Sequence, residues 1–163
     1  MRSIQNWVTY RQLTPSDIPT MCDIDRQTLR FNWNRSFFAH RMHQFPELFI
    51  GAFYDGEIVG FIGGCIKDEQ YSPDIIVQKP YGLISKIAVL PAYTRHGIGT
   101  AMTRYLIEAY QHYYPDVDEL IAQVRDDNTT ALRFYAQPAF NFTTITTHTY
   151  SDGTAGRILS QPL

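Results

Sequence analysis

Residues 85–104 read SKIAVLPAYTRHGIGTAMTR and carry the most informative pattern in the chain. Residues 83–90 form a short apolar run bounded by Gly82 and Pro91, which is typical of a buried strand. After Gly97, apolar side chains recur at spacings of three and four residues, which predicts a helix with one apolar face. The apolar positions of that helix are Ile98, Ala101, Met102, Tyr105, Leu106, Ala109 and Tyr110. The segment therefore predicts a buried strand, a turn with glycines and an amphipathic helix.

The turn between this strand and this helix has the features of a phosphate site. The first amides of a helix lack partners within it, and the helix dipole makes that end positive. Gly97 and Gly99 let a ligand approach the backbone where a Cβ would collide. The Lys of a Walker loop is missing, and Met102 stands where a dinucleotide fingerprint needs a small residue. A glycine turn without a ligand remains the alternative interpretation.

Length and composition predict one globular domain over residues 1–163. Hydrophobic residues make up 44% of the chain and charged residues 18%, which excludes a disordered protein. A net charge of −2 provides no bulk attraction to nucleic acid or an anionic membrane, so neither is expected as a partner. Cys22 and Cys65 are too few for a disulfide framework, and we expect buried thiols. The chain has no apolar run long enough to span a membrane and no signal-peptide core, which predicts a cytoplasmic protein.

Periodicity, caps and turns divide the rest of the chain into a mixed α/β order. Thr14, Pro15 and Asp17 form a helix-start signal, and Asp55-Gly56 is a hairpin turn. The predicted strands cover residues 7–13, 48–53, 58–66, 83–90, 120–125, 140–150 and 157–163. The predicted helices cover residues 15–29, 35–43, 98–114 and 129–135. Residues 67–81 are predicted to form a long loop that contains at most a short strand over 74–77.

A second motif lies downstream, with VRDDNTTALRFY at residues 124–135 followed by Ala139-Phe140. The two motifs together resemble the GCN5-related N-acetyltransferase (GNAT) superfamily. In that family A-V-x-P at a strand end leads to [QR]-x-x-G-x-[GA], which cradles the acetyl-CoA pyrophosphate. A later V-x-x-x-N-x-x-A-x-x-[FL]-Y-x-x-x-G-F carries the pantetheine contact and the acid. The matching segments here are residues 88–91, 94–99 and 124–140.

This resemblance implies a fold and a reaction. The fold is a single α/β domain whose mixed, mostly antiparallel sheet of about seven strands is flanked by about four helices. The fourth and fifth strands of that sheet splay apart. The implied reaction is direct attack of a primary amine on the thioester of acetyl-CoA, with acetyl-CoA as the co-substrate and no metal.

The resemblance also assigns residues to the co-substrate. Backbone groups at the end of the fourth strand bond the pantetheine, and amides in the glycine turn face the pyrophosphate. Asn128 contacts the pantetheine or only caps a helix. Tyr135 is a core aromatic or the general acid, since a phenol of pKa about 10 can return a proton to a thiolate of pKa about 8.5. The implied co-substrate residues are Ile87, Ala88, Val89, Thr94, Arg95, His96, Gly97, Ile98, Gly99, Thr100, Asn128 and Tyr135.

The sequence departs from the family pattern at positions that matter for chemistry. Thr94 replaces the usual Gln or Arg, which leaves the backbone donors in place, and Ala139 replaces a Gly. Leu83 and Gln123 occupy positions where relatives often carry a basic group, so the general base is not identified. A water held by Ser85 or Gln123, or else His148 or Tyr150 on the late hairpin, are the candidates. Strand alternation places Lys86 on the face opposite Ser85 and so away from the reaction.

Within the superfamily, the chain is similar to the peptide N-terminal acetyltransferases of the ribosomal-protein type. FNWN at residues 31–34, followed by two Phe, and YSDG at residues 150–153 carry this similarity. It implies an amine acceptor such as a peptide N-terminus, bound by a monomer or a homodimer. The implied acceptor-site residues are Phe31, Trp33, Ser85, Gln123, His148 and Tyr150. A small-molecule acetyltransferase acting on a polyamine, aminoglycoside or other amine, and a non-catalytic acyl-CoA sensor, remain alternatives.

Overall fold

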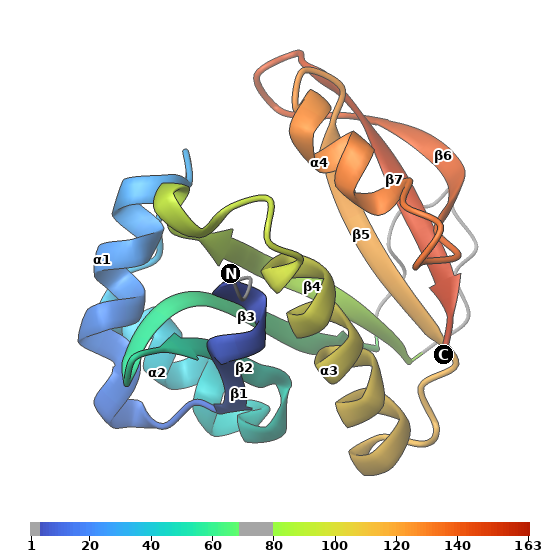
Figure 1. The fold of residues 1–163 in the computed structure, drawn as a ribbon. Helices are drawn as coiled ribbons and strands as arrows, with labels where there is room; N and C mark the ends of the chain where they lie inside the picture. The colour runs from blue at the N-terminus through green and yellow to red at the C-terminus, as the bar shows by residue number, and fades with distance from the viewer. Residues whose placement is uncertain (1–3, 69–79) are drawn as a thin grey trace.

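A computed structural model describes residues 4–68 and 80–163, in which seven strands form one sheet (Figure 1). The strands are β1 (Val8–Gln12), β2 (Phe49–Tyr54), β3 (Glu57–Lys67), β4 (Tyr81–Val89), β5 (Glu119–Arg125), β6 (Thr143–Thr149) and β7 (Ala155–Pro162). Their spatial order is β1-β2-β3-β4-β5-β7-β6. Among these described strands only β4 and β5 run parallel, and every other neighbouring pair is antiparallel. The predicted mixed, mostly antiparallel sheet is confirmed.

Four α-helices are found in the described part of the chain and flank the sheet, as predicted. They are α1 (Ile18–Thr28), α2 (Arg35–Gln44), α3 (Ile98–Tyr113) and α4 (Thr129–Tyr135). Helices α1 and α2 lie on one side of the N-terminal half of the sheet, and α3 lies on the other (Figure 1). The core divides in the same way. Phe38 of α2 packs with Phe49 and Phe61 in one cluster, and Leu106 of α3 packs with Ile62 in another.

Short 3-10 turns precede several elements: η1 (Ile4–Trp7), η2 (Pro15–Asp17), η3 (Pro46–Leu48) and η4 (Pro91–Tyr93). The predicted helix start at Thr14 is a capping box, although its first turn is the 3-10 helix η2 and α1 begins only at Ile18. The hairpin turn at Asp55 and Gly56 is also confirmed, and both residues have positive φ. The strand considered for residues 74–77 lies outside the described residues.

Strands β4 and β5 are paired over only two positions, Gly82 with Leu120 and Leu83 with Ile121. By contrast, β5 pairs with β7 along its whole length. The two parallel strands therefore separate after Leu83, which confirms the predicted splay (Figure 1). This separation leaves the facing edges of the two strands open to a ligand, since backbone groups that are not paired in a sheet need another partner.

A β-bulge in β4 corrects one expectation. The register of β3 against β4 shifts between two glycines and leaves Ser85 without a partner. Ser85 Oγ contacts Cys65 Sγ at 3.3 Å, and Cys65 is paired with Leu83, which packs in a cluster away from α3. Lys86 Nζ bonds Asp25 of α1, on that same face. The prediction that Lys86 and Ser85 face opposite ways is wrong, because the extra residue of a bulge interrupts the alternation.

Helices long and apolar enough to cross a membrane are not found among residues 4–68 and 80–163. The remaining strand and helix bounds agree with the predicted ranges to within a few residues, apart from β6. That strand begins at Thr143, because residues 136–142 form a compact connection after α4.

Candidate active site

A cavity of about 1330 Å³ opens where β4 and β5 separate. Its wall comes from the α1–α2 connection, β4 with the following turn, β5, α4 and the β6–β7 turn. The wall includes fifteen of the predicted site residues: Phe31, Trp33, Ser85, Ile87, Val89, Thr94, Arg95, Gly97, Ile98, Gly99, Thr100, Gln123, Asn128, Tyr135 and Tyr150. Segments that are far apart in the sequence thus converge on one site.

Three predicted site residues lie outside the wall of this cavity. The side chain of Ala88 is buried in the cluster that contains α1 and α2, so only its backbone remains available to a ligand. His96 is half-buried in the turn before α3. The ring of His148 lies 4.8 Å from that of Tyr150, and of these two residues Tyr150 is the one that borders the cavity.

The turn before α3 and the first residues of that helix border the cavity. Gly97 is the N-cap of α3 and has φ of 75°, so no side chain caps the helix there. Arg95 also has positive φ, at 65°, which is costly for a residue with a Cβ. Left-handed residues in such turns form anion-binding concavities of backbone N–H groups, and the helix dipole adds positive potential. The geometry suits a phosphate group.

The glycine inside the first turn of α3 sits against α4. A Cβ added at Gly99 would lie 3.1 Å from Cε2 of Phe134 and 3.7 Å from Cδ1 of Ile87. The first of these distances is tighter than ordinary van der Waals contact. A side chain at Gly99 would therefore push into the passage between the helix and β4, where the cavity runs.

Tyr135, at the end of α4, borders the cavity and is only 6% exposed. Its ring makes edge contacts with Phe134 at 5.0 Å and Phe142 at 5.1 Å between centroids. This burial raises the pKa of the Tyr135 phenol well above its ordinary value, since burial disfavours the charged form. The hydroxyl therefore remains protonated at neutral pH and is available as a proton donor.

Asn128 caps α4. Its side-chain oxygen accepts a hydrogen bond from Ala131 N at 3.1 Å. The oxygen of the side-chain amide is thus used within the protein, and its NH₂ group is the part that can donate to a ligand. Asn128 also borders the cavity, so a capping role and a ligand contact are compatible.

One end of the cavity, where the predicted acceptor-site residues lie, is framed by aromatic rings from two connections. Phe31 of the α1–α2 connection is 58% exposed, and Tyr150 precedes the β6–β7 turn. The guanidinium of Arg125 lies 5.1 Å from the Phe31 ring centroid and 3.9 Å from that of Tyr150. Arg125 also donates to Asp152 at 3.0 Å. The two connections are therefore bridged by a cation between two rings.

Tyr150, one of these two aromatic residues, also forms a side-chain hydrogen bond with Gln123. Partial burial raises the pKa of its phenol, while a hydrogen bond with Gln123 and the nearby charge of Arg125 act in the opposite direction. Gln123 itself is exposed on β5 and borders the cavity. These two predicted acceptor-site residues thus contact each other.

Sequence reasoning missed several residues of this site. Arg125 was not singled out, although an Arg between two motif positions is a visible signal. The buried pair Asp25 and Lys86, whose Nζ and Oδ1 lie 2.9 Å apart, was also missed. A lysine inside an otherwise apolar strand signals a buried partner, since charged side chains are almost never fully buried unless they are paired.

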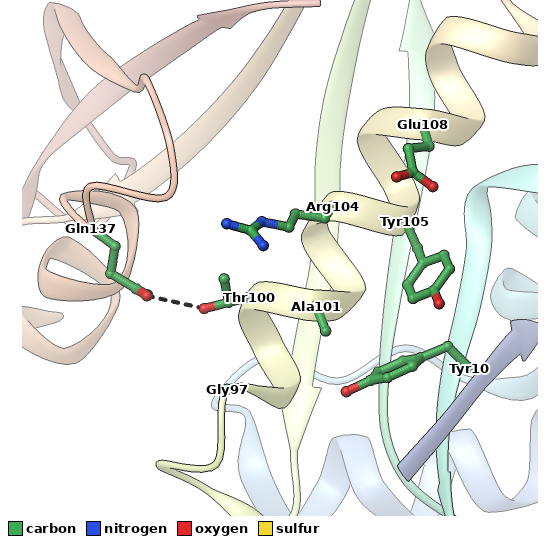
Figure 2. Close-up of a pocket in the computed structure, with 8 residues that line it drawn as sticks. All are labelled: Tyr10, Gly97, Thr100, Ala101, Arg104, Tyr105, Glu108 and Gln137. Carbon is green, nitrogen blue, oxygen red and sulfur yellow. Dashed lines mark hydrogen bonds between the residues drawn. The ribbon is translucent and has the colours of Figure 1, made fainter. Parts of the chain in front are cut away.

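A second hollow of about 510 Å³ lies against the outer side of α3 (Figure 2). It shares Gly97, Thr100 and Gln137 with the large cavity, and Thr100 Oγ1 donates to Gln137 Oε1 at 3.0 Å. Figure 2 shows Arg104 extending from α3 on the Gln137 side. The start of α3 therefore borders both spaces.

Residues 18–140 match the Acetyltransferase (GNAT) family, which is more than half of the chain. The chain belongs to this family. It is 29% identical over 152 residues to an N-alpha-acetyltransferase of Sulfurisphaera tokodaii, a match that covers 91% of this chain and 89% of that protein. The chain is thus an acetyl-CoA-dependent N-acetyltransferase, as the sequence motifs predict.

Solved structures similar to this GNAT protein cover nearly all of it. Ard1 from Thermoplasma volcanium has a TM-score of 0.79 and 23% identity, and the match covers 96% of this chain and 98% of that one. The ribosomal-protein-S18-alanine N-acetyltransferase from Escherichia coli has a TM-score of 0.71 and 25% identity, with 95% and 93% covered. The predicted GNAT fold and its similarity to the ribosomal-protein-type enzymes are confirmed.

Proposed function

We propose that this GNAT protein acetylates the α-amine of a peptide or protein N-terminus. The observation that carries the proposal is the lack of a side-chain base. Among the described residues that line the cavity there is no His and no Glu, and Asp127, at the turn before α4, is the sole carboxylate. The motif positions that relatives use for a base hold Leu83 and Gln123. Such a site favours an acceptor that is already partly deprotonated.

An α-amine meets that requirement better than a lysine side chain. Its pKa of about 7.7–8.0 leaves roughly a tenth to a sixth of it neutral at pH 7. A lysine amine with a pKa of about 10.4 is neutral to well under a thousandth. The match to an N-alpha-acetyltransferase supports the same acceptor class. The exposed aromatic frame of Phe31 and Tyr150 offers the end of an extended chain a place to lie.

The co-substrate fits the cavity along its length. The amides that follow Gly97 would hold the pyrophosphate, with Arg95 and Thr94 beside it. The open edge of β4 at Ile87 to Val89 and the NH₂ group of Asn128 would bond the pantetheine. In this arrangement the acetyl end would lie near Tyr135, which borders the same cavity as Asn128 at the other end of the short helix α4.

Acetyl-CoA supplies the acetyl group as a thioester, and the remaining tasks fall to this chain. The neutral amine forms a C–N bond to the carbonyl carbon as the C–S bond breaks. We assign Tyr135 as the donor of a proton to the leaving sulfur. The amine then loses its extra proton to water, and Ser85, Gln123 and Tyr150, which line the cavity, are the candidates to hold a water relay.

Release of free CoA tests this proposal. The purified protein and acetyl-CoA would be incubated without acceptor, with a pool of short peptides bearing free α-amines, with spermidine, and with an aminoglycoside. We expect the peptide pool to release CoA faster than any other arm. Release only with spermidine or the aminoglycoside would identify a small-molecule acetyltransferase. Acetyl-CoA binding without release of CoA in any arm would reject an α-amine acceptor of this kind.

A further inference from the structure

A buried ion pair joins β4 to α1 beside the acceptor end of the cavity. Lys86 Nζ lies 2.9 Å from Asp25 Oδ1, and the two side chains are 6% and 0% exposed. Although Lys86 borders the cavity, its ammonium donates hydrogen bonds to Asp25 and to the backbone carbonyl of Phe31. The hydrogen bonds of Lys86 are therefore made to other groups of the protein.

Both members of this pair bind the segment at residues 29–34, which connects α1 to α2. Lys86 Nζ donates to the carbonyl of Phe31 at 2.6 Å. Trp33 N donates to Asp25 Oδ2 at 2.9 Å, and Asn32 Nδ2 donates to Asp25 Oδ1 at 3.1 Å. Three consecutive residues of one connection are thus bonded to two side chains from elsewhere in the fold.

The same segment provides the aromatic wall of the acceptor end. Phe31 is largely exposed and faces Arg125, while the Trp33 ring packs edge-on against Phe37 and Phe38 and lies 5.0 Å from Lys86 Nζ. The segment is neither helix nor strand, so no backbone ladder of the sheet holds it. The charged pair beneath it supplies side-chain hydrogen bonds to three of its residues.

Stability alone does not account for such a pair. Two charges taken out of water lose hydration, and an apolar pair of similar volume is often as stable or more so. A pair that also satisfies three hydrogen bonds of one connection, however, fixes a single conformation of that connection. Its role is then to hold a surface in place.

We propose that Asp25 and Lys86 are positioning residues for the acceptor: through Phe31 and Trp33 they fix the wall against which the acceptor chain lies. They do not touch the reacting atoms. This inference rests on the proposed function, because it assumes that the acceptor is a chain end bound along this wall. Loss of the pair should weaken acceptor binding without affecting the co-substrate.

The test compares two double variants in the full chain. D25L/K86M replaces the pair by apolar side chains of similar size and removes all three hydrogen bonds to the segment. D25N/K86Q removes both charges but keeps an acceptor for Trp33 N and a donor for the Phe31 carbonyl. The matched control is D23N/R26Q, which removes an exposed ion pair from the same helix.

Each protein would be assayed by release of CoA with the peptide pool, and its acetyl-CoA Kd would be measured by calorimetry. For D25L/K86M we expect the peptide KM to rise about tenfold or more, with kcat and the acetyl-CoA Kd within about threefold of native. For D25N/K86Q and for the control we expect a peptide KM within about threefold of native. If the pair only stabilised the fold, the peptide KM would not rise selectively in D25L/K86M while kcat and the acetyl-CoA Kd stayed near their native values.

Fluorescence of Trp33 in a Trp7→Phe background gives a readout that needs no acceptor. We expect acrylamide to quench Trp33 more strongly in D25L/K86M than in D25N/K86Q, since only the former frees the segment. An unchanged peptide KM in folded D25L/K86M, or a tenfold rise in folded D25N/K86Q, overturns the inference while the proposed function stands. Failure of the native protein to acetylate any peptide rejects the proposed function, and the inference with it.

Discussion

Leu83 of β4 is paired with Ile121 of β5, and this is the last pairing before the two parallel strands separate. The cavity opens where the two strands separate. The end of β4 leads into the turn before α3, and the end of β5 leads into α4, so both motifs of the sequence border one cavity. A regular sheet at this point would have left no space between them.

Substitution of Gly99 by Glu should impair co-substrate binding. The new side chain would collide with Phe134 and place a negative charge at the helix end that we assign to the pyrophosphate. We expect the acetyl-CoA Kd to rise at least about tenfold, or about 1.4 kcal/mol, by calorimetry. Ala39→Glu, an equal charge change on an exposed position of α2, is the control and should bind normally. Unchanged affinity in folded Gly99→Glu would contradict the assignment.

Tyr135→Phe should slow the chemical step more than it weakens binding. General acid catalysis contributes about 10²–10⁴-fold, so kcat should fall within that range while the acetyl-CoA Kd stays within about threefold. Tyr113→Phe, at an exposed tyrosine of α3, should leave both constants unchanged. Where pre-steady-state kinetics show that chemistry limits turnover, an unaffected kcat in Tyr135→Phe would exclude this phenol as the acid.

Two substitutions at Asn128 separate its two possible roles. Asn128→Ala removes the cap of α4 and should lower the free energy of unfolding by about 1 kcal/mol in urea titrations. Asn128→Asp retains an oxygen to accept from Ala131 N but loses the NH₂ donor. We expect Asn128→Asp to keep nearly native stability while its acetyl-CoA affinity falls several-fold. Native affinity in Asn128→Asp would restrict this residue to capping.

Buried phenols should make the fold sensitive to base. Tyr110 is fully buried and donates to the Cys65 carbonyl at 2.7 Å, and its burial raises the pKa of the phenol well above its ordinary value. The unfolded chain releases this proton near pH 10 whereas the folded chain retains it, so the unfolded state binds fewer protons. The contribution of this protonated phenol to the free energy of unfolding is fully present below pH 10. Above pH 10 it decreases by about 1.4 kcal/mol per pH unit for one such group.

Urea unfolding at pH 9, 10 and 11 measures this effect. Tyr110→Phe should be less stable than native at pH 9, yet lose less stability between pH 10 and 11. Ile62→Val, which weakens the same core cluster without removing a phenol, should keep the native pH dependence. Equal pH dependence in native protein and Tyr110→Phe would show that this phenol does not contribute.

Local patterns accounted for most of the fold. The spacing of apolar residues after Gly97 marked α3, and the dipeptide Asp55-Gly56 marked the hairpin, because each signal lies within a few residues of its effect. The β-bulge at Ser85 could not be predicted, since it depends on how β3 and β4 align in register. The faces of Ser85 and Lys86 were accordingly assigned wrongly.

The residues that line the cavity could be predicted only in part, because short sequence patterns do not reveal contacts between distant segments. Motif positions identified the residues at the start of α3 and on α4, which the structure brings into one wall. The bridge from Arg125 to Phe31 and the pair of Asp25 with Lys86 join segments that are far apart in the chain. Contacts of this kind depend on tertiary structure, and one sequence carries no periodicity that reveals them.

The identity of the acceptor amine is the most direct test of the proposed function. Short peptides with free α-amines would compete at pH 7 with matching peptides whose N-termini are blocked and which contain one Lys, with products identified by mass spectrometry. We expect the α-amine peptides to be acetylated preferentially, because their neutral fraction exceeds that of the lysine amine by roughly two orders of magnitude. Preferential acetylation of the Lys peptides, or of neither set while a polyamine or aminoglycoside reacts, would contradict the proposed α-amine acceptor.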